Sequence, residues 1–222
     1  MEKQELKDFI QNDIRTFGRR HGKKLSKRKQ GLMENLLPKI APNLAETTEN
    51  QVILEIGFGN GEHLRELSIA NPNSIIIGAE PFTNGVAALL SAITNESDNT
   101  VLTEYKNIRI FPDDVRLLLK DFDTAQFNEI WILHPDPWPK ARHEKRRLLS
   151  HDFLNLLSKH IGKTGKIIIG TDHWEYYDWI ENELKKTNLK IKSKEIDTIK
   201  TRYQTKNKAG TSAPKYFILG NQ

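Results

Sequence analysis

Five short apolar segments alternate with segments of helical pattern along the chain, and this alternation limits the possible folds more than any other feature. The apolar segments are rich in Ile and Val at consecutive positions, which is typical of strands that are covered on both faces. They lie at 52–56, 74–79, 107–111, 129–134 and 166–171. The helical candidates lie at 62–70, 83–93, 115–120, 151–160 and 173–187. A repeated strand–helix order predicts an α/β fold with a mostly parallel, doubly wound sheet.

The segments on either side of this alternation predict an edge pair and an arm. Segments 190–197 and 215–219 are expected to pair antiparallel and to close one edge of the sheet. Near the N-terminus, residues 32–40 predict a short helix that Pro38 and Pro42 end. No internal repeat or low-complexity segment is present. We therefore expect an arm at 1–31 and a single domain at 32–222.

The charge of the chain is concentrated in the expected arm. The formal net charge is +5, and residues 1–31 hold ten Lys or Arg against four Asp or Glu. Residues 15–29 carry eight cations and no carboxylate. Such a block attracts polyanions and releases their counterions, so we expect the arm to be a flexible clamp on a nucleic-acid backbone. Deletion of residues 1–30 should then weaken binding and flatten its salt dependence. A solvated tail without a partner is the alternative.

Several kinds of chemistry are excluded by composition and spacing. The chain has no cysteine, so it has no thiol nucleophile and no thiolate metal site. Its seven histidines show no metal-binding spacing, and no Gly-x-Ser-x-Gly motif is present. No apolar run is long enough to span a bilayer, and the charged first residues do not resemble a signal peptide. We expect a cytoplasmic protein without a metal or a membrane partner.

A glycine-rich turn follows the first expected strand and leads directly into a helix. Its sequence is Glu55-Ile56-Gly57-Phe58-Gly59-Asn60-Gly61. The chain lacks the lysine of a phosphate-binding P-loop here, and Glu62 stands where a dinucleotide-binding loop needs its third glycine. The remaining pattern, Glu-x-Gly-x-Gly-x-Gly, is found in methyltransferases that use S-adenosylmethionine (SAM).

Two more acidic residues follow strands at the same expected sheet edge. Glu80 ends the second strand and is placed to accept hydrogen bonds from ribose hydroxyls. Asp113 follows the third strand and is placed to accept from an adenine amino group. The Glu55 carboxylate is expected to receive the methionine ammonium. A single acid at such a point is more often a helix cap, but three at successive strand ends predict a SAM site.

A proline-rich loop follows the fourth strand and carries the expected reactive side chain. Its sequence is Pro135-Asp136-Pro137-Trp138-Pro139-Lys140, and the three prolines forbid a helix and stiffen the backbone around Asp136. Residues 140–147 hold five cations and one carboxylate. A rigid acid beside an aromatic ring and a basic segment suits a nucleic-acid base with its phosphates. Core packing of Trp138 and a solvated basic helix are the alternatives.

With these motifs, the chain closely resembles the bacterial tRNA (guanine-N7-)-methyltransferase family. The matching segments are 15–20, 53–61, 135–147, 170–172 and 201–204. The resemblance implies a Rossmann-like class I methyltransferase that transfers a methyl group from SAM to N7 of a guanosine in the tRNA variable loop, position 46. It assigns cofactor contacts to Glu55, Gly57, Gly59, Gly61, Glu80, Asp113 and Asp136. It also makes Asp136 the catalytic residue.

Substrate contacts are implied by the same resemblance. They fall on Lys140, Asp172, Thr201, Arg202, Tyr203 and Gln204. The family usually has glutamate where this chain has Gln204. An amide oxygen still accepts from guanine N1–H or from the 2-amino group, but without the assistance of a charge. Asp172 has a second interpretation, as the cap of the following helix.

The chemistry of N7 bears on the role of Asp136. Guanine N7 already offers a lone pair, so we expect Asp136 to orient the base and to stabilise the developing positive charge rather than to remove a proton. Two alternatives stay open: a methyltransferase for another RNA or an exocyclic base amine, and an RNA-binding module without catalysis. The sequence indicates no obligate protein partner and leaves a monomer and a homodimer open.

Overall fold

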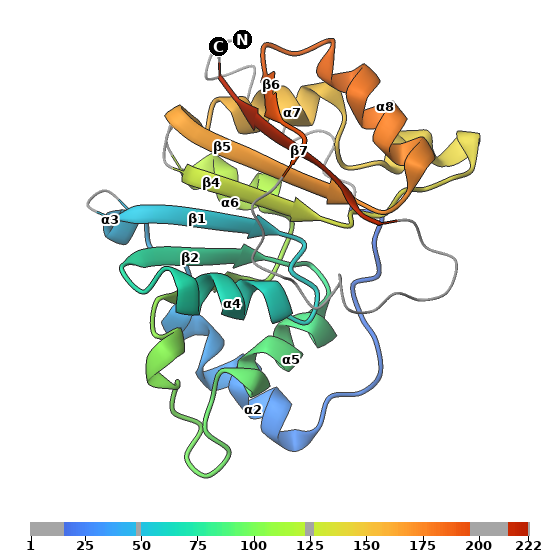
Figure 1. Cartoon of the computed structure of the whole chain (residues 1–222). Coiled ribbons are helices and arrows are strands. Elements are labelled where there is room, and N and C mark those ends of the chain that lie inside the picture. The colour runs from blue at the N-terminus through green and yellow to red at the C-terminus, as the bar shows by residue number, and fades with distance from the viewer. Residues whose placement is uncertain (1–15, 48–49, 123–126, 196–212, 222) are drawn as a thin grey trace. The chain divides into compact units, whose positions relative to one another are not determined.

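The computed structural model describes residues 16–47, 50–122, 127–195 and 213–221 of the 222-residue chain. These residues belong to two compact units, an N-terminal unit up to residue 123 and a C-terminal unit from residue 124 (Figure 1). Across both units the chain is a mixed α/β protein with seven named strands, mostly parallel, and with antiparallel strands near the C-terminus.

The N-terminal unit alternates helices with three parallel strands. Its strands are β1 (Gln51–Ile56), β2 (Ser74–Ala79) and β3 (Ile108–Phe111). Its helices are α2 (Lys27–Asn35), α3 (Leu44–Thr47), α4 (Glu62–Ala70), α5 (Thr83–Ala92) and α6 (Val115–Asp121), with short 3-10 turns η1 (Leu37–Ile40) and η2 (Thr103–Tyr105). β2 lies between β1 and β3, and Gln51 pairs with Ser74 at the start of the β1–β2 ladder.

The core of this unit confirms, for β1 and β2, the prediction of strands covered on both faces. Five consecutive residues of β1 are buried, from Val52 to Ile56, and β2 is nearly as buried. Leu64 and Leu67 of α4 and Leu89 and Leu90 of α5 are also buried. Aliphatic surface removed from water contributes about 25 cal/mol per Å², so this layer of side chains is the main stabilising contact of the unit.

Helix α2 begins inside the expected arm. The helix predicted at 32–40 lies instead at Lys27–Asn35 and is capped by the Ser26 hydroxyl. The guanidinium of Arg28 donates to Ser91 Oγ, Thr94 Oγ1 and Asn99 Oδ1 at 2.6, 2.9 and 3.0 Å. These bonds fix α2 beside α5, so the expected boundary at residue 31 falls within a helix that packs on the N-terminal unit.

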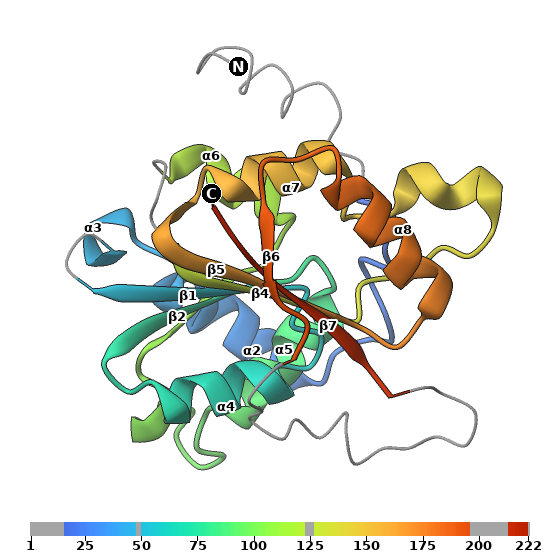
Figure 2. The same cartoon turned by 45° about the horizontal axis from the view of Figure 1, so that its top comes forward.

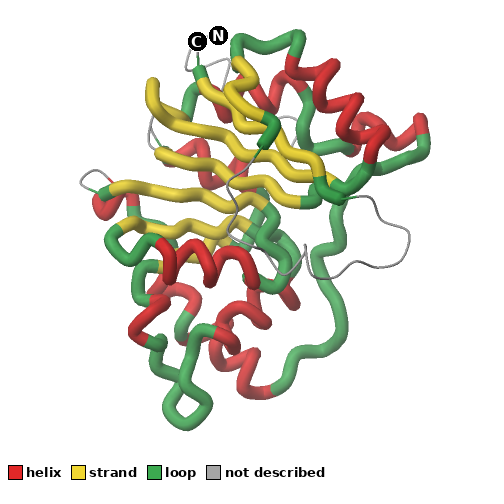
Figure 3. The backbone as a smooth tube through the Cα atoms, viewed as in Figure 1, coloured by secondary structure: helices red, strands yellow, loops and turns green. Residues whose placement is uncertain are grey.

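The described residues of the C-terminal unit form four strands in the order β4-β5-β7-β6. Its elements are β4 (Phe127–Leu133), η3 (Ala141–Arg146), α7 (His151–Ser158), β5 (Ile161–Thr171), α8 (Trp174–Leu184), β6 (Lys190–Ser193) and β7 (Lys215–Gly220). β4 and β5 are parallel, and β7 is antiparallel to both β5 and β6. Figures 2 and 3 show α7 and α8 beside these strands. The antiparallel C-terminal pair predicted from the sequence is therefore confirmed.

Two details differ from the sequence prediction. β3 and β4 alternate between buried and more exposed residues, so they are not covered evenly on both faces. On the exposed face of β4, Trp131 donates from Nε1 to Glu129 Oε2 at 2.9 Å. β5 begins at Ile161, five residues earlier than expected, because Ile161 pairs with Phe127 at the start of β4.

Candidate functional site

The glycine turn between β1 and α4 has a backbone that only glycine adopts easily. Gly57, Gly59 and Gly61 have φ values of 75°, 58° and 75°, in the left-handed region. A Cβ atom added at Gly57 or Gly59 would have no heavy atom within 4 Å, so open space lies beside this backbone. At Gly61, such an atom would be 2.5 Å from Leu89 Cδ1. The first two glycines therefore leave room for a ligand, and the third allows α4 to approach α5.

Glu80 holds the turn in place from the end of β2. Its Oε2 accepts from the Gly59 amide at 2.8 Å and its Oε1 accepts from the Phe82 amide at 2.8 Å. The residue is buried. A carboxylate that accepts two backbone N–H groups is held rigidly in one position. The structure thus brings together two of the residues predicted for the cofactor, Glu80 and Gly59.

Glu55 lies within β1 and faces a histidine that the sequence analysis did not connect with it. Its Oε2 is 3.2 Å from Nδ1 of His63 on α4, and both side chains are 4% exposed. The two residues are eight positions apart and lie on different elements, so their spacing in the sequence does not predict the contact. Only the place of His63 on the buried face of α4 points to it. The geometry directs the Glu55 carboxylate toward α4, and its contact with the cofactor stays a prediction.

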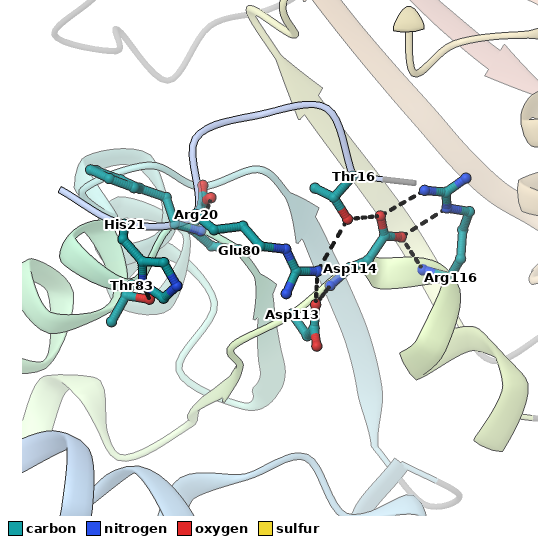
Figure 4. Close-up of polar contacts among 9 residues, drawn as sticks. Thr16, Arg20, His21, Glu80, Thr83, Asp113, Asp114 and Arg116 are labelled. Carbon is teal, nitrogen blue, oxygen red and sulfur yellow. Dashed lines mark hydrogen bonds and ion pairs between the residues drawn. The ribbon is translucent and has the colours of Figure 1, made fainter. Parts of the chain in front are cut away.

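Part of the basic N-terminal region lies against the acidic residues that follow β3. Arg20 Nη2 donates to Asp113 Oδ1 at 2.7 Å, and the Thr16 hydroxyl donates to Asp114 Oδ2 at 2.9 Å (Figure 4). The Arg20 carbonyl also accepts from the Thr83 amide at 3.0 Å. The carboxylate predicted to bind adenine, Asp113, is therefore paired with an arginine of the same unit and is about one-third exposed.

Asp114 has a structural role beside Asp113. It caps α6 by accepting from the Arg116 amide at 3.0 Å, and the Arg116 guanidinium donates to both of its oxygens at 2.9 and 2.8 Å. Burial would raise the pKa of Asp114, but the hydrogen bonds and charge of Arg116 and the Thr16 hydroxyl outweigh it and lower the pKa. Asp114 therefore stabilises the folded chain as a carboxylate, and this contribution is lost as the pH falls through its lowered pKa.

In the C-terminal unit, the proline-rich loop after β4 has a strained backbone around Asp136. His134 and Trp138 have φ values of 50° and 42°, which non-glycine residues seldom adopt. Asp136 lies between them and is exposed. The loop therefore presents the Asp136 carboxylate to solvent from a backbone that cannot relax into a regular element.

The indole of Trp138 is surrounded by basic side chains of η3. The Arg146 guanidinium carbon lies 5.1 Å from the ring centroid, and the His143 ring meets it edge-on at 5.7 Å. Desolvation and then the charges of Arg146, Arg142 and Lys140 lower the pKa of His143. Trp138 is half-buried rather than a core residue. Its environment is a cationic one, as the prediction of a nucleic-acid contact requires.

The basic segment 140–147 does not present all its cations to solvent. Lys140, Arg142 and Lys145 are exposed, but the side chain of Arg147 is only 5% exposed. The alternative of a fully solvated basic helix does not hold for Arg147, because its guanidinium is enclosed by the loop and by α8.

Asp172 follows β5 and pairs with a histidine from the end of β4. Its Oδ1 is 3.4 Å from Nδ1 of His134, and its side chain is 42% exposed. The alternative interpretation of Asp172 as the cap of the next helix is wrong, since His173 caps α8 by accepting from the Tyr176 amide. Thr201, Arg202, Tyr203 and Gln204 lie outside the described residues.

Within the ranges that the structure describes, no group of three or more His, Asp or Glu side chains is arranged to hold a metal ion. No helix among residues 16–47, 50–122, 127–195 and 213–221 has both the length and the apolar character of a membrane span.

Comparison with known proteins gives matches over most of the chain. The family described as "Putative methyltransferase" matches residues 49–215. Two proteins named "tRNA (guanine-N(7)-)-methyltransferase" are close in sequence. The one from Caulobacter vibrioides is 33% identical over 219 residues, which cover 92% of this chain and 93% of that protein. The one from Neorickettsia sennetsu is 34% identical over 193 residues, which cover 87% and 85%.

Solved structures agree on the fold at much lower identity. "Structure of an Antibiotic Related Methyltransferase" matches with a TM-score of 0.53 and 15% identity, over 90% of this chain and 97% of that one. The precorrin-6y C5,15-methyltransferase of Geobacter metallireducens matches with a TM-score of 0.52 and 14% identity, over 90% of each chain.

The family match and the named relatives define the chain as a SAM-dependent methyltransferase, and its fold agrees with that of solved class I enzymes. Within that class, the chain belongs to the tRNA (guanine-N(7)-)-methyltransferase family, as its matches over most of its length show.

Proposed function

We propose that this protein transfers a methyl group from SAM to N7 of guanosine 46 in the variable loop of tRNA. The observation that carries the proposal is the Asp136 loop, which holds an exposed carboxylate between two strained residues beside a cationic aromatic cluster. The names of the relatives supply the choice of guanine N7 and of tRNA.

The residues of the glycine turn fit SAM. Open space beside Gly57 and Gly59 admits a ligand close to the backbone, and the fixed carboxylate of Glu80 lies next to it. Glu55, Gly61, Asp113 and Asp136 complete the proposed cofactor set. When bound, SAM supplies an electrophilic methyl group on a sulfonium. Contact with adenine by Asp113 requires that its ion pair with Arg20 rearrange or include the base.

The proposed substrate residues supply orientation and charge. Asp136 orients the guanine and stabilises the positive charge that develops on the purine as N7 is alkylated. N7 carries no proton, so this role needs no general base. Lys140 contributes a phosphate contact, and Asp172 with the 201–204 segment contributes contacts to the guanosine.

The N-terminal cations are expected to add a salt-dependent part of tRNA binding. Lys23 and Lys24 are exposed, and removal of residues 1–30 would also delete the first residues of α2, so point substitutions are the sharper test. The double variant Lys23→Gln/Lys24→Gln should bind tRNA more weakly, and the slope of log K against log salt should fall by about one to two units. Filter binding over a salt series measures both quantities.

A matched control is Lys39→Gln/Lys106→Gln, which removes two exposed cations of the same unit outside the segment. It should change neither quantity by more than about twofold. Equal affinity of the Lys23/Lys24 variant and the unchanged protein at every salt concentration would refute a role for these lysines in tRNA binding.

Nucleoside analysis tests the proposed reaction. Unmodified tRNA is incubated with SAM that carries a labelled methyl group, and the digested product is separated by chromatography. The proposal predicts 7-methylguanosine as the labelled nucleoside. A methylated exocyclic amine would keep the cofactor and replace the substrate atom, whereas bound SAM and bound tRNA without product would indicate an RNA-binding protein without catalysis.

A further inference from the structure

Arg147 has the least exposed side chain among the cations of the basic segment, and its donors face the Asp136 loop. Nε donates to the Pro137 carbonyl at 2.9 Å and Nη2 donates to the Trp138 carbonyl at 3.4 Å. Its carboxylate partner, Glu144, is 3.5 Å away and about half exposed. A buried charge needs partners, and here two loop carbonyls provide them.

The other side of the same guanidinium contacts α8. Its central carbon lies 5.0 Å from the ring centroid of Trp179 and 5.6 Å from that of Tyr176. The two rings are themselves in contact, with centroids 5.6 Å apart, and Tyr176 is fully buried. Arg147 therefore connects the loop to a helix that is fixed in the core of the C-terminal unit.

The loop needs such a connection because it has few donors of its own. Pro135, Pro137 and Pro139 have no backbone N–H, and the strained conformations of His134 and Trp138 do not persist without outside support. An arginine fork that binds successive carbonyls supplies that support, and a lysine ammonium cannot reproduce its geometry.

The charges of Asp136 and Arg147 both act on one buried group. Burial raises the pKa of the Tyr176 hydroxyl, the charge of Arg147 lowers it and the charge of Asp136 raises it. The guanidinium that holds the loop lies beside this phenol, with its central carbon 5.6 Å from the ring centroid.

We infer that Arg147 is a positioning residue for the methyl transfer. It fixes the position of Asp136 by linking the backbone of residues 137–138 to Tyr176 and Trp179. This inference rests on the proposed function for its effect on catalysis. It separates Arg147 from the exposed cations of the same segment, whose side chains are free to meet phosphates. Arg147 itself is enclosed and contributes little to the attraction of tRNA.

The test compares Arg147→Lys and Arg147→Met with Lys145→Met, an exposed cation of the same segment. Each full-length variant is assayed for kcat, for the KM of tRNA over a salt series and for the dissociation constant of SAM. Both Arg147 variants should lose about 10- to 100-fold in kcat, since a small displacement of a reacting group is costly. Their salt slope and SAM affinity should stay within about twofold of the unchanged protein. Lys145→Met should instead raise KM and lower the slope by about one unit.

A second measurement needs no substrate. Hydrogen exchange should become at least about fivefold faster at the His143 amide of Arg147→Lys, because this amide bonds to the Lys140 carbonyl at the end of the loop. If the unchanged protein methylates no tRNA, the proposed function fails, and this exchange rate still tests the fastening of the loop.

Three results would overturn the inference. The first is unchanged kcat in Arg147→Met with a higher KM and a lower salt slope, which would make Arg147 a phosphate contact. The second is a lower melting temperature with unchanged kcat per folded molecule, which would leave only a structural role. The third is an unchanged rate of hydrogen exchange at the His143 amide in Arg147→Lys. This variant keeps the positive charge, so it can be measured even if Arg147→Met does not fold.

Discussion

Replacing Asp136 with asparagine is expected to lower kcat by about 100- to 1,000-fold while the chain stays folded. The substitution keeps the shape of the side chain on an exposed loop position, so packing is unchanged. It removes the negative charge that is proposed to stabilise the purine as N7 becomes positive. Because no proton is taken from N7, the loss should be about the same at every pH between about 6 and 9.

Single-turnover assays at saturating SAM and tRNA measure this effect apart from binding. Asp178→Asn is the matched control, since Asp178 is an exposed acid on α8 of the same unit. It should keep kcat within about twofold. Full activity of Asp136→Asn with an unchanged pH profile would contradict the electrostatic role, whereas a loss that appears only toward low or high pH would indicate a proton transfer.

Replacing Glu80 with glutamine is expected to weaken SAM binding by about 30- to 100-fold. The carboxylate accepts from the Gly59 and Phe82 amides at 2.8 Å each. A glutamine offers one acceptor and places an NH₂ group against the other N–H donor. Loss of one charge-assisted bond costs about 2–3 kcal/mol, and each 1.4 kcal/mol is a factor of ten in affinity.

Calorimetric titration with SAM measures this loss directly. The control is Glu104→Gln, an exposed acid of the N-terminal unit with no assigned cofactor contact, which should bind SAM with unchanged affinity. At saturating SAM, the kcat of Glu80→Gln should recover to within about threefold, because Glu80 holds the turn and is assigned to the ribose rather than to the reacting atoms. An unchanged SAM affinity would contradict the assigned cofactor site.

The strands and helices that the sequence predicted well are those whose pattern is local. β2 and α4 have the predicted limits, Ser74–Ala79 and Glu62–Ala70, because an apolar run and a glycine turn mark them. The start of β5 was missed, since Ile161 joins the sheet only by pairing with Phe127. α2 was placed too late because the bonds that fix it, from Arg28, reach residues more than sixty positions away.

The same distinction applies to the candidate site. The link between Glu80 and the glycine turn follows from the rule that parallel strands present their carboxyl ends at one edge. The pairs Glu55–His63, Arg20–Asp113 and His134–Asp172 do not follow from any spacing in the sequence. They depend on which side chains the packed helices and loops bring together.

Charge counted along the sequence overstates how many cations can meet a nucleic acid. Arg28 and Arg147 belong to the two basic segments, but the guanidinium of each donates hydrogen bonds within its own unit. Lys23, Lys24 and Lys140 remain exposed. The number of cations available to tRNA can therefore be assigned only after burial is known.

The most direct test of the account is methyl transfer to a tRNA that carries 7-deazaguanosine at position 46. This nucleoside replaces N7 with a carbon and keeps the Watson–Crick edge of guanine. The account predicts that the modified tRNA still binds, with an affinity within about threefold of the unmodified tRNA, but accepts no labelled methyl group. Methylation of the modified tRNA at an undiminished rate would contradict the account, because the methyl acceptor would then be another atom or another nucleotide.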